Sequence, residues 1–266
     1  MKIVIPTFRR KHKQITFHNL CRKYQKKVTF VVRGEESCFF REQYPNNSLL
    51  VLPEHVHDIV GTRNYILDHI KGLIYILDDD LSFWKRQKRK VGSEKEIKWK
   101  NISINHHEKE QTKLMTLLQN SIEDGYMCTG VGLLDTKPTI GRYPFDVNYK
   151  LGGNLCIRNT KKFMYRYDPK LPASEDLDLQ LQILSSGHRN KVFFNYVVSE
   201  RGYAPGGCSV YRTLLFHNRS NLLLEKKWPE FVKSKRRTVT SGPWKGKSKV
   251  HLVIQWKKTF QHFSTL

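Results

Sequence analysis

Short runs of apolar, mostly β-branched residues recur along the first three quarters of the chain, and polar stretches separate them. Near-continuous apolar runs of this length indicate strands of a sheet that is covered on both faces. Seven runs fit this description: Lys2–Ile5, Val28–Val32, Leu49–Leu52, Leu73–Leu77, Cys128–Leu134, Leu155–Ile157 and Val192–Val198.

Two of the intervening segments are typical of amphipathic helices. They are Gly61–Ile70 and Glu108–Ile122, and the second carries Leu114, Leu118 and Ile122 at helical spacing. Strands that alternate with helices predict an α/β fold, here a GT-A-like (Rossmann-like) mostly parallel sheet flanked by helices.

The segment Ser174–Ile183 gives conflicting signals. It alternates polar and apolar residues strictly, which is typical of a strand. However, Ser174 suits a helix N-cap, the acidic residues that follow suit a first turn, and Gly187 would end a helix of ordinary length. We therefore predict a helix.

Charge is the strongest compositional signal. The 266 residues contain 47 Lys and Arg against 24 Asp and Glu, for a net charge of +23, yet 39% are hydrophobic, which is too many for a disordered basic tail. Much of the charge lies in Lys85–Lys100 and Lys226–Lys249, and Trp84, Trp99, Trp228 and Trp244 lie in or beside these segments. Basic residues interleaved with aromatics favour a nucleic-acid partner. A solvated surface and an anionic membrane remain alternatives.

The chain contains no apolar run long enough to span a membrane, and Pro6 interrupts the N-terminal run too early for a signal peptide. We expect a soluble, cytoplasmic monomer without a membrane partner. The five cysteines are widely spaced and include no CxxC pair, which indicates reduced thiols, several of them in the core.

The most informative stretch is the apolar run Leu73–Leu77 followed by Asp78, Asp79 and Asp80. Open α/β sheets bind ligands at the carboxyl ends of their strands, and adjacent carboxylates suit Mg²⁺ or Mn²⁺ bound together with substrate phosphates. Asp78 and Asp80 are expected to point the same way and form the better pair. The alternative is an acidic turn.

Two further motifs follow. Glu175 and Asp176 lie at the predicted helix start, where the helix dipole keeps a carboxylate ionised as a general base, or where they simply cap the helix. Gly152, Gly153 and Asn154 would allow close backbone approach and orient a polyol, or form an ordinary turn.

In this order the motifs resemble those of GT-A-fold glycosyltransferases: Ile5–Arg9, Gly61–Asn64, Asp78–Asp80, Gly152–Asn154 and Ser174–Asp176. The resemblance implies a UDP-sugar donor and a Mn²⁺ or Mg²⁺ cofactor. It implies that Thr7, Arg9, Arg33, Arg63, Asn64, Asp78, Gly153 and Asn154 bind the nucleotide sugar. It also implies Asp78, Asp80 and His217 as metal ligands, and Asp176 with Glu175 as catalytic carboxylates, of which Asp176 is the candidate base.

Within this fold, the small size, the basic composition and the segment Gly206–Thr213 resemble the TET-associated glycosyltransferases of phages. That resemblance implies a phage enzyme in an infected bacterial cell, which moves a sugar to the hydroxyl of a hydroxymethylated pyrimidine, first of all 5-hydroxymethylcytosine, in DNA. The expected DNA and acceptor contacts are Trp84, Tyr203, Arg212, Lys235, Arg236 and Arg237.

We expect a catalytic domain over residues 1–208 and a basic C-terminal extension over 209–266 that packs on it. Residues 85–109 are poorly patterned and predict a mobile loop near the donor. Three other functions remain open: a metal-dependent nuclease, a non-catalytic DNA-binding module, and a glycosyltransferase with a glycan or protein acceptor.

Overall fold

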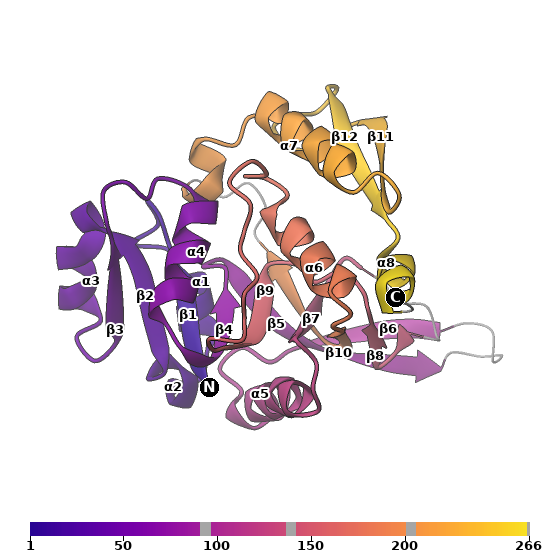
Figure 1. Ribbon diagram of the computed structural model, residues 1–266. Helices are drawn as coiled ribbons and strands as arrows, with labels where there is room; N and C mark the ends of the chain where they lie inside the picture. Colours follow the sequence, from indigo (N-terminus) through magenta and orange to yellow (C-terminus); the bar gives the residue numbers. More distant parts are fainter. Residues whose placement is uncertain (91–96, 137–141, 201–205, 265–266) are drawn as a thin grey trace.

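The computed structural model describes residues 1–90, 97–136, 142–200 and 206–264, and it confirms the predicted α/β class (Figure 1). One ten-stranded mixed sheet forms the centre, in the order β3-β2-β1-β4-β9-β7-β10-β5-β6, with β8 paired to β10. The strands are β1 Lys2–Pro6, β2 Val28–Arg33, β3 Ser48–Leu52, β4 Gly72–Leu77, β5 Leu81–Lys90, β6 Ile97–Ser103, β7 Cys128–Leu133, β8 Phe145–Val147, β9 Asn154–Asn159 and β10 Asn190–Glu200. All seven predicted strands are present.

The strands β3, β2, β1 and β4 run parallel, as do β7 and β10, whereas β9, β5, β6 and β8 pair antiparallel with their neighbours. The helices are α1 Ile15–Asn19, α2 Arg22–Gln25, α3 Ser37–Gln43, α4 Ile59–His69, α5 Glu108–Glu123, α6 Glu175–Ser185, α7 Leu214–Lys227 and α8 Trp256–Ser264, with short 3-10 turns η1 Gly34–Glu36 and η3 Gly207–Val210.

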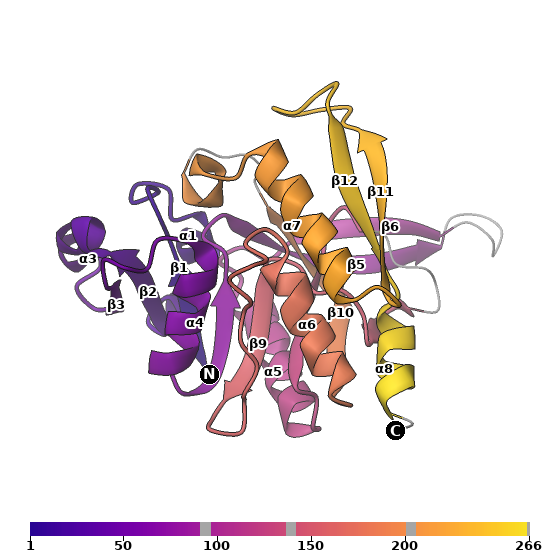
Figure 2. The ribbon, with the colours of Figure 1, turned by 45° about the horizontal axis from the view of Figure 1, so that its top comes forward.

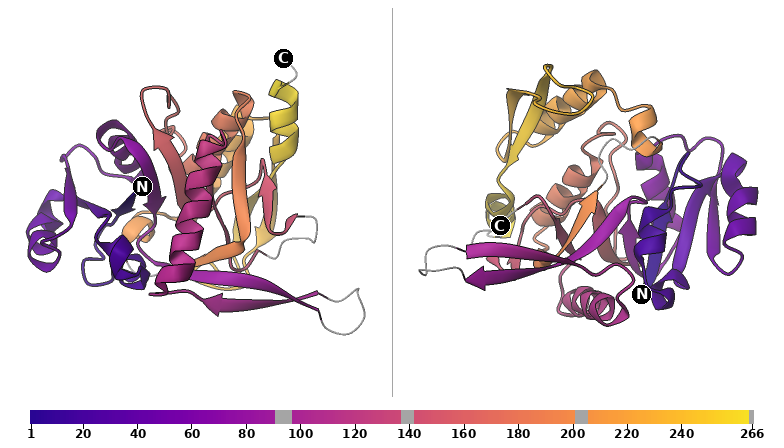
Figure 3. Two further views of the ribbon diagram at one scale, coloured as in Figure 1. Left: turned by 90° about the horizontal axis from the view of Figure 1, so that it is seen from below. Right: turned by 180° about the vertical axis from the view of Figure 1, so that it is seen from behind.

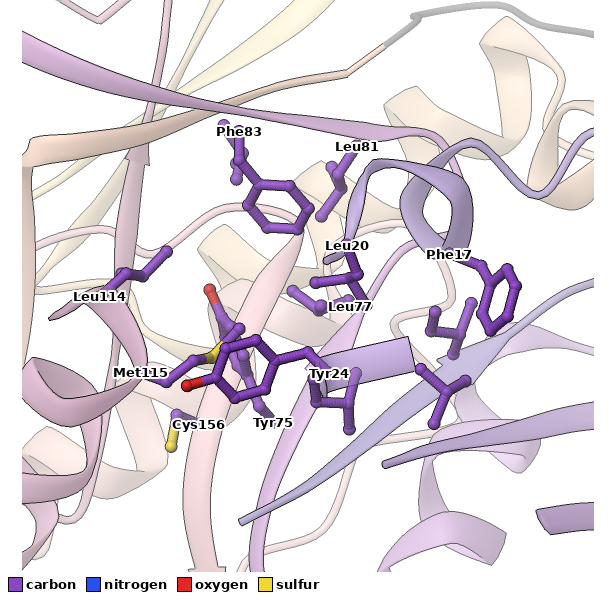
Figure 4. Packing of buried hydrophobic residues seen from close by; sticks show 14 of the residues in the cluster. Phe17, Leu20, Tyr24, Tyr75, Leu77, Leu81, Phe83, Leu114, Met115 and Cys156 are labelled. Carbon is purple, nitrogen blue, oxygen red and sulfur yellow. The ribbon is translucent and has the colours of Figure 1, made fainter. Parts of the chain in front are cut away.

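Helices cover both faces of the sheet, which is why its seven predicted strands are nearly continuous apolar runs. Side chains of α1, α2, α3 and α5 pack on one face, and those of α4 and α6 pack on the other. Figure 4 shows the first of these cores, where Tyr24, Tyr75 and Met115 lie close together and Cys156 lies beside them. Along β1, Ile3 and Ile5 face this core while Val4 faces the opposite one.

The helix predicted after Ser174 is confirmed as α6, and its burial explains the misleading alternation of its residues. Leu179 and Ile183 pack toward the sheet, whereas Leu181 and Leu184 pack toward the C-terminal elements, so no single apolar stripe is needed. The predicted N-cap bond is not made, because the Ser174 hydroxyl donates to Asn221 Oδ1 at 2.7 Å instead.

The mobile loop predicted over residues 85–109 is wrong for residues 85–90 and 97–109, while residues 91–96 lie outside the described residues. This part of the chain forms β5 and β6, which pair with each other while β5 also pairs with β10, and it then leads into α5. Figure 3 shows the hairpin projecting beyond the helices. Leu81 and Phe83 are fully buried, and Arg86 is too, because its guanidinium donates to the carbonyls of Leu134 and Thr136. A basic strand lacks the apolar pattern by which a strand is predicted.

The C-terminal elements pack on α6. The strands β11 Val232–Thr238 and β12 Ser248–Ile254 form a separate antiparallel hairpin beside α7 (Figure 2). A third core joins these elements to α6, and its members are Leu171, Leu181, Leu184, Leu224, Val232 and Trp256. None of the helices in the described ranges is long and apolar enough to cross a bilayer.

Candidate functional site

A cavity of about 960 Å³ lies between the carboxyl ends of the central strands and the C-terminal elements. Residues that follow β1 and β4 line it, together with Glu200 at the end of β10 and the start of α6. The opposite wall comes from η3, α7, β12 and the turn before β12. This is the place where open α/β sheets bind ligands.

The three aspartates after β4 all line the cavity, and they are tied to the loop after β1. Thr7 Oγ1 donates to Asp79 Oδ2 at 2.6 Å, and Arg10 NH1 contacts Asp79 Oδ1 at 2.5 Å and Asp80 Oδ2 at 3.1 Å. Burial, together with repulsion by Asp78 and Asp79, raises the pKa of Asp80 to about 6 although Arg10 opposes the shift. The loop after β1 therefore holds the acidic motif in place.

Arg10, not Arg9, contributes the guanidinium to this cluster. Arg9 has a positive φ of 54°, is exposed, and is absent from the described residues that line the cavity. The left-handed turn at Arg9 points its neighbour inward, and sequence inspection had no signal for such a turn at a non-glycine residue. Thr7 and Arg33 do line the cavity, and the Arg33 guanidinium lies 3.8 Å from the centre of the Phe8 ring.

Arg63 joins the two acidic motifs. Its side chain is 11% exposed and contacts Glu175 Oε1 at 2.8 Å and Asp78 Oδ1 at 3.2 Å. Burial, with repulsion from Asp176, raises the pKa of Glu175 to about 7 even though Arg63 opposes it. Through its two contacts, Arg63 orients the carboxylates of Asp78 and Glu175. Its neighbour Asn64 exchanges hydrogen bonds with the backbone of Tyr167 and has a structural role.

Gly153 and Glu200 meet beside Asp78. Gly153 has a φ of +56°, and a Cβ there would lie 2.4 Å from Glu200 Oε1 and 3.4 Å from Asp78 Oδ2. Glu200 is exposed, yet partial desolvation at the cavity edge and repulsion from Asp78, Asp80 and Asp176 raise its pKa to about 7. Glycine is therefore required here by both conformation and space.

Sequence reasoning missed Glu200, although a usable signal exists. It lies two residues beyond the predicted strand Val192–Val198, the same relation that singled out the aspartates after Leu77. Asn154, which was expected to bind the nucleotide sugar, is buried, and its Oδ1 accepts from Val131 N at 2.8 Å and from the Tyr75 hydroxyl at 3.0 Å. It holds three strands together.

The carboxylates fit a divalent cation of the Mg²⁺ or Mn²⁺ type. Asp78, Asp80 and Glu200 offer hard oxygen donors, and desolvation together with repulsion between acids raises the pKa values of Asp80 and Glu200. No ready-made cluster of three His, Cys, Asp or Glu ligands occurs within the described ranges. That is compatible with Mg²⁺, which is commonly held by one or two carboxylates together with substrate phosphates.

His217 lies in different surroundings from these acids. Its Nε2 is 3.1 Å from Asn221 Nδ2, its ring lies beside Trp244, and burial together with the charges of Lys249 and Arg212 lowers its pKa to about 4. A site surrounded by positive charge favours an anion over a metal cation. The structure therefore gives no support to His217 as a third metal ligand.

The expected acceptor residues lie in four different places. Arg212 lines the cavity, and Lys235, Arg236 and Arg237 are exposed on β11. Trp84 is on β5, where its indole donates to Ser199 Oγ at 2.9 Å, and it does not line the cavity in the described part of the chain. The expected contact Tyr203 lies outside the described residues.

Comparison with known proteins identifies the family. The model of the TET-Associated Glycosyltransferase family matches residues 1–207. This chain belongs to the TET-associated glycosyltransferases. It is 27% identical over 211 residues to a beta-glucosyl-HMC-alpha-glucosyl-transferase of Enterobacteria phage T2, covering 75% of this chain and 72% of that protein. The enzyme of the same name from phage T6 is 26% identical over 241 residues, 86% and 82% of the two chains.

Among solved structures, GalNAc-T7 with UDP, GalNAc and Mn²⁺ matches with a TM-score of 0.50 at 12% identity, over 84% of this chain and about half (48%) of that one. At this identity the match supports the fold alone, and it confirms the GT-A-like architecture. The protein is a glycosyltransferase related to the phage enzymes, as the motif order predicted.

Proposed function

We propose that this glycosyltransferase moves a sugar from a UDP-sugar to a hydroxyl carried by a modified pyrimidine in DNA, first of all 5-hydroxymethylcytosine. One observation carries the proposal: a single cavity joins the strand-end carboxylates Asp78, Asp80 and Glu200 to a cationic wall from the C-terminal elements. The net charge of +23 and the relationship to phage HMC-modifying enzymes support DNA as the acceptor.

The donor binds, in this proposal, at the end of the cavity built by the loop after β1. Phe8 and Arg33 lie beside the nucleotide, and Asp78 and Asp80 face its diphosphate. These carboxylates would hold Mn²⁺ or Mg²⁺, which would supply a Lewis acid for the charge that develops on the departing diphosphate. Arg63 keeps Asp78 and Glu175 in fixed orientations through its two contacts.

Asp176 is the acid best placed to assist the acceptor. Both Glu175 and Asp176 line the cavity, but Glu175 is 3% exposed and engaged with Arg63. In a transfer that inverts the anomeric centre, the Asp176 carboxylate accepts the proton of the attacking hydroxyl as the new glycosidic bond forms and the sugar–phosphate bond breaks. In a retaining transfer it orients the acceptor instead.

A second acceptor has a specific observation in its favour. The T2 and T6 relatives are named for transfer to beta-glucosyl-HMC, a cytosine that already carries a sugar. If this chain shares that acceptor, the attacking hydroxyl belongs to the first sugar, and the base itself need not reach the carboxylates.

The test is mass spectrometry of nucleosides from three DNAs that contain cytosine, 5-hydroxymethylcytosine or its β-glucoside, each incubated with the protein, Mn²⁺ and a panel of UDP-sugars. We expect one added sugar on one of the two modified bases and none on cytosine. Transfer only to a glycan or protein acceptor, with all three DNAs unchanged, would contradict the proposal.

A further inference from the structure

Three cations, Lys150, Arg212 and Lys249, line the cavity. Lys150 precedes β9, Arg212 lies between η3 and α7, and Lys249 belongs to β12. In the described part of the chain none of the three has an acidic partner within ion-pair distance, and Arg212 Nε is buried without a hydrogen-bond partner. Three separate segments thus bring together positive charge that forms no ion pair within the described residues.

These cations repel one another. Burial lowers the pKa of Lys249, and the charges of Arg212 and Lys150 lower it further. Arg212 also faces Glu175 and Asp176, which raise its pKa, but neither comes within contact distance. Like charges held together in this way become favourable when an anion lies between them, and a phosphate accepts several charge-assisted hydrogen bonds at once.

The cluster continues onto the face of the β11–β12 hairpin that carries Lys249 and His251. Arg237 pairs with Lys249 and Lys235 pairs with His251, and directly opposed residues of antiparallel strands point to the same face. Lys249 and His251 line the cavity, while Lys235 and Arg237 are exposed. A strip of positive charge therefore leads from the exposed side chains of the hairpin into the cavity. Figure 2 shows the position of the hairpin beside α7.

We propose that this strip and the Lys150–Arg212–Lys249 cluster hold the phosphodiester backbone of the acceptor strand, so that the target nucleotide enters the cavity outside the double helix. The inference rests on the proposed DNA acceptor. The position of the strip distinguishes the backbone phosphates of the acceptor strand from the donor diphosphate, which faces Asp78 and Asp80 at the other wall. A nucleic-acid backbone is the anion that has phosphates along its whole length.

The size of the cavity suits a single nucleotide that has left the duplex. Its volume of about 960 Å³ is at the upper end of the range for small-molecule pockets, roughly 300–1,000 Å³, and far too small for a segment of double helix. The rings of Trp244 and His217 lie with centroids 5.8 Å apart on the same wall, next to Lys249. They give an unstacked base an aromatic surface.

The first test measures DNA binding without a donor. The probe is a fluorescent single-stranded 12-mer, a length of roughly one binding site, that contains one 5-hydroxymethylcytosine. We expect Lys249→Met to raise its Kd about tenfold and Lys249→Arg to keep most of the affinity. Lys161→Met is the matched control, because Lys161 is exposed just after the far end of β9, and its Kd should match the native value. An unchanged Kd in Lys249→Met would overturn the proposal.

The second test separates acceptor from donor phosphate during turnover. Lys249→Met should raise KM for DNA about tenfold and leave KM for the UDP-sugar within about twofold. A rise confined to the donor KM would assign the cluster to the donor diphosphate and contradict the inference. Thermal melting of each variant checks that it is folded.

The third test addresses extrusion. A mismatch opposite the target lowers the cost of unpairing, so the native enzyme should modify a mismatched duplex faster than a matched one. Equal rates would contradict extrusion. The outcomes separate the two proposals: if no DNA is modified but Lys249→Met still weakens 12-mer binding, the proposed reaction fails and the backbone site stands.

Discussion

At the scale of single residues, Gly153 is the point where the backbone approaches two carboxylates of the site. Its left-handed φ and its closeness to Glu200 and Asp78 leave no room for a side chain. The pattern of two glycines before Asn154 predicted close approach, but the partner turned out to be a carboxylate of β10.

We expect Gly153→Ala to lower the free energy of unfolding by about 1–2 kcal/mol through backbone strain, and to lower kcat at least about tenfold because Glu200 must move. Urea unfolding and initial rates measure the two effects. The matched control is Gly34→Ala, since a Cβ there meets no atom within 4 Å. If both variants keep full activity, Glu200 is not part of the site.

The residue scale also shows the limits of prediction from sequence. The aspartates after β4 and the acids at the start of α6 were recognised because their positions follow from strand and helix ends. Four other residues of the cavity were not recognised. Arg10 reaches it through a turn of its loop, and Lys150 and Lys249 come from parts of the chain that are distant in sequence. Glu200 lies at the end of a strand where no acidic motif stands out. Such placement depends on tertiary packing, which local pattern does not encode.

At the scale of elements, α5 is tied to the sheet through Glu110. Its carboxylate accepts from Tyr196 of β10 at 2.9 Å, from Lys85 of β5 at 3.0 Å and from Lys113 at 3.0 Å. Burial alone would raise its pKa, but these hydrogen bonds outweigh that effect and lower the pKa to about 2.

Because the folded pKa lies below the unfolded value of about 4.3, the ionised carboxylate stabilises the fold above that pH, and the stabilisation is lost as pH falls toward about 2. We expect Glu110→Gln to lower the free energy of unfolding by about 2 kcal/mol at pH 7, with the difference shrinking below pH 4.3. Denaturant unfolding across pH measures it. Glu108→Gln on the same helix, 62% exposed, should have little effect, and a constant difference at all pH values would contradict the account.

The junction between α6 and α7 depends on Asp178, which is fully buried. It accepts from the Trp228 indole at 2.8 Å, from Lys227 Nζ at 2.9 Å and from Gln182 Nε2 at 2.7 Å. This contact fixes the C-terminal elements, and with them the cationic wall, relative to the start of α6.

We expect Asp178→Ala to destabilise the protein by about 3 kcal/mol or more, since it leaves buried donors without a partner. Asp168, whose side chain is 23% exposed and contacts the same lysine, provides the control, and Asp168→Ala should cost less than about 1 kcal/mol. Equal losses, measured by denaturant unfolding, would mean that burial does not decide the strength of this junction.

At the scale of the whole molecule, the α/β class, the seven strands and the family were predictable because the apolar runs and the motif order are local. The hairpin β5–β6 was not, because its strands are basic. The division into residues 1–208 and 209–266 stays a proposal, and the third core explains how the second part packs without forming a separate body.

The net charge predicts strong salt dependence of DNA affinity. The logarithm of the association constant should fall with the logarithm of salt concentration by about 0.9 per phosphate contact. The triple variant Lys235→Gln, Arg236→Gln and Arg237→Gln should reduce that slope by about 2 to 3. Fluorescence anisotropy of a labelled duplex measures it. A salt-independent affinity in the native protein would exclude an electrostatic DNA surface.

In the proposed reaction, the residues of one cavity catalyse the transfer of a sugar to a modified base of DNA. The most direct measurement compares sugar added to DNA containing 5-hydroxymethylcytosine or its β-glucoside by the native protein and by Asp80→Ala, with Asp124→Ala at the exposed end of α5 as control. We predict product from the native protein and the control, and a loss of about 100-fold or more in Asp80→Ala. Undiminished transfer by a folded Asp80→Ala would place the reaction elsewhere.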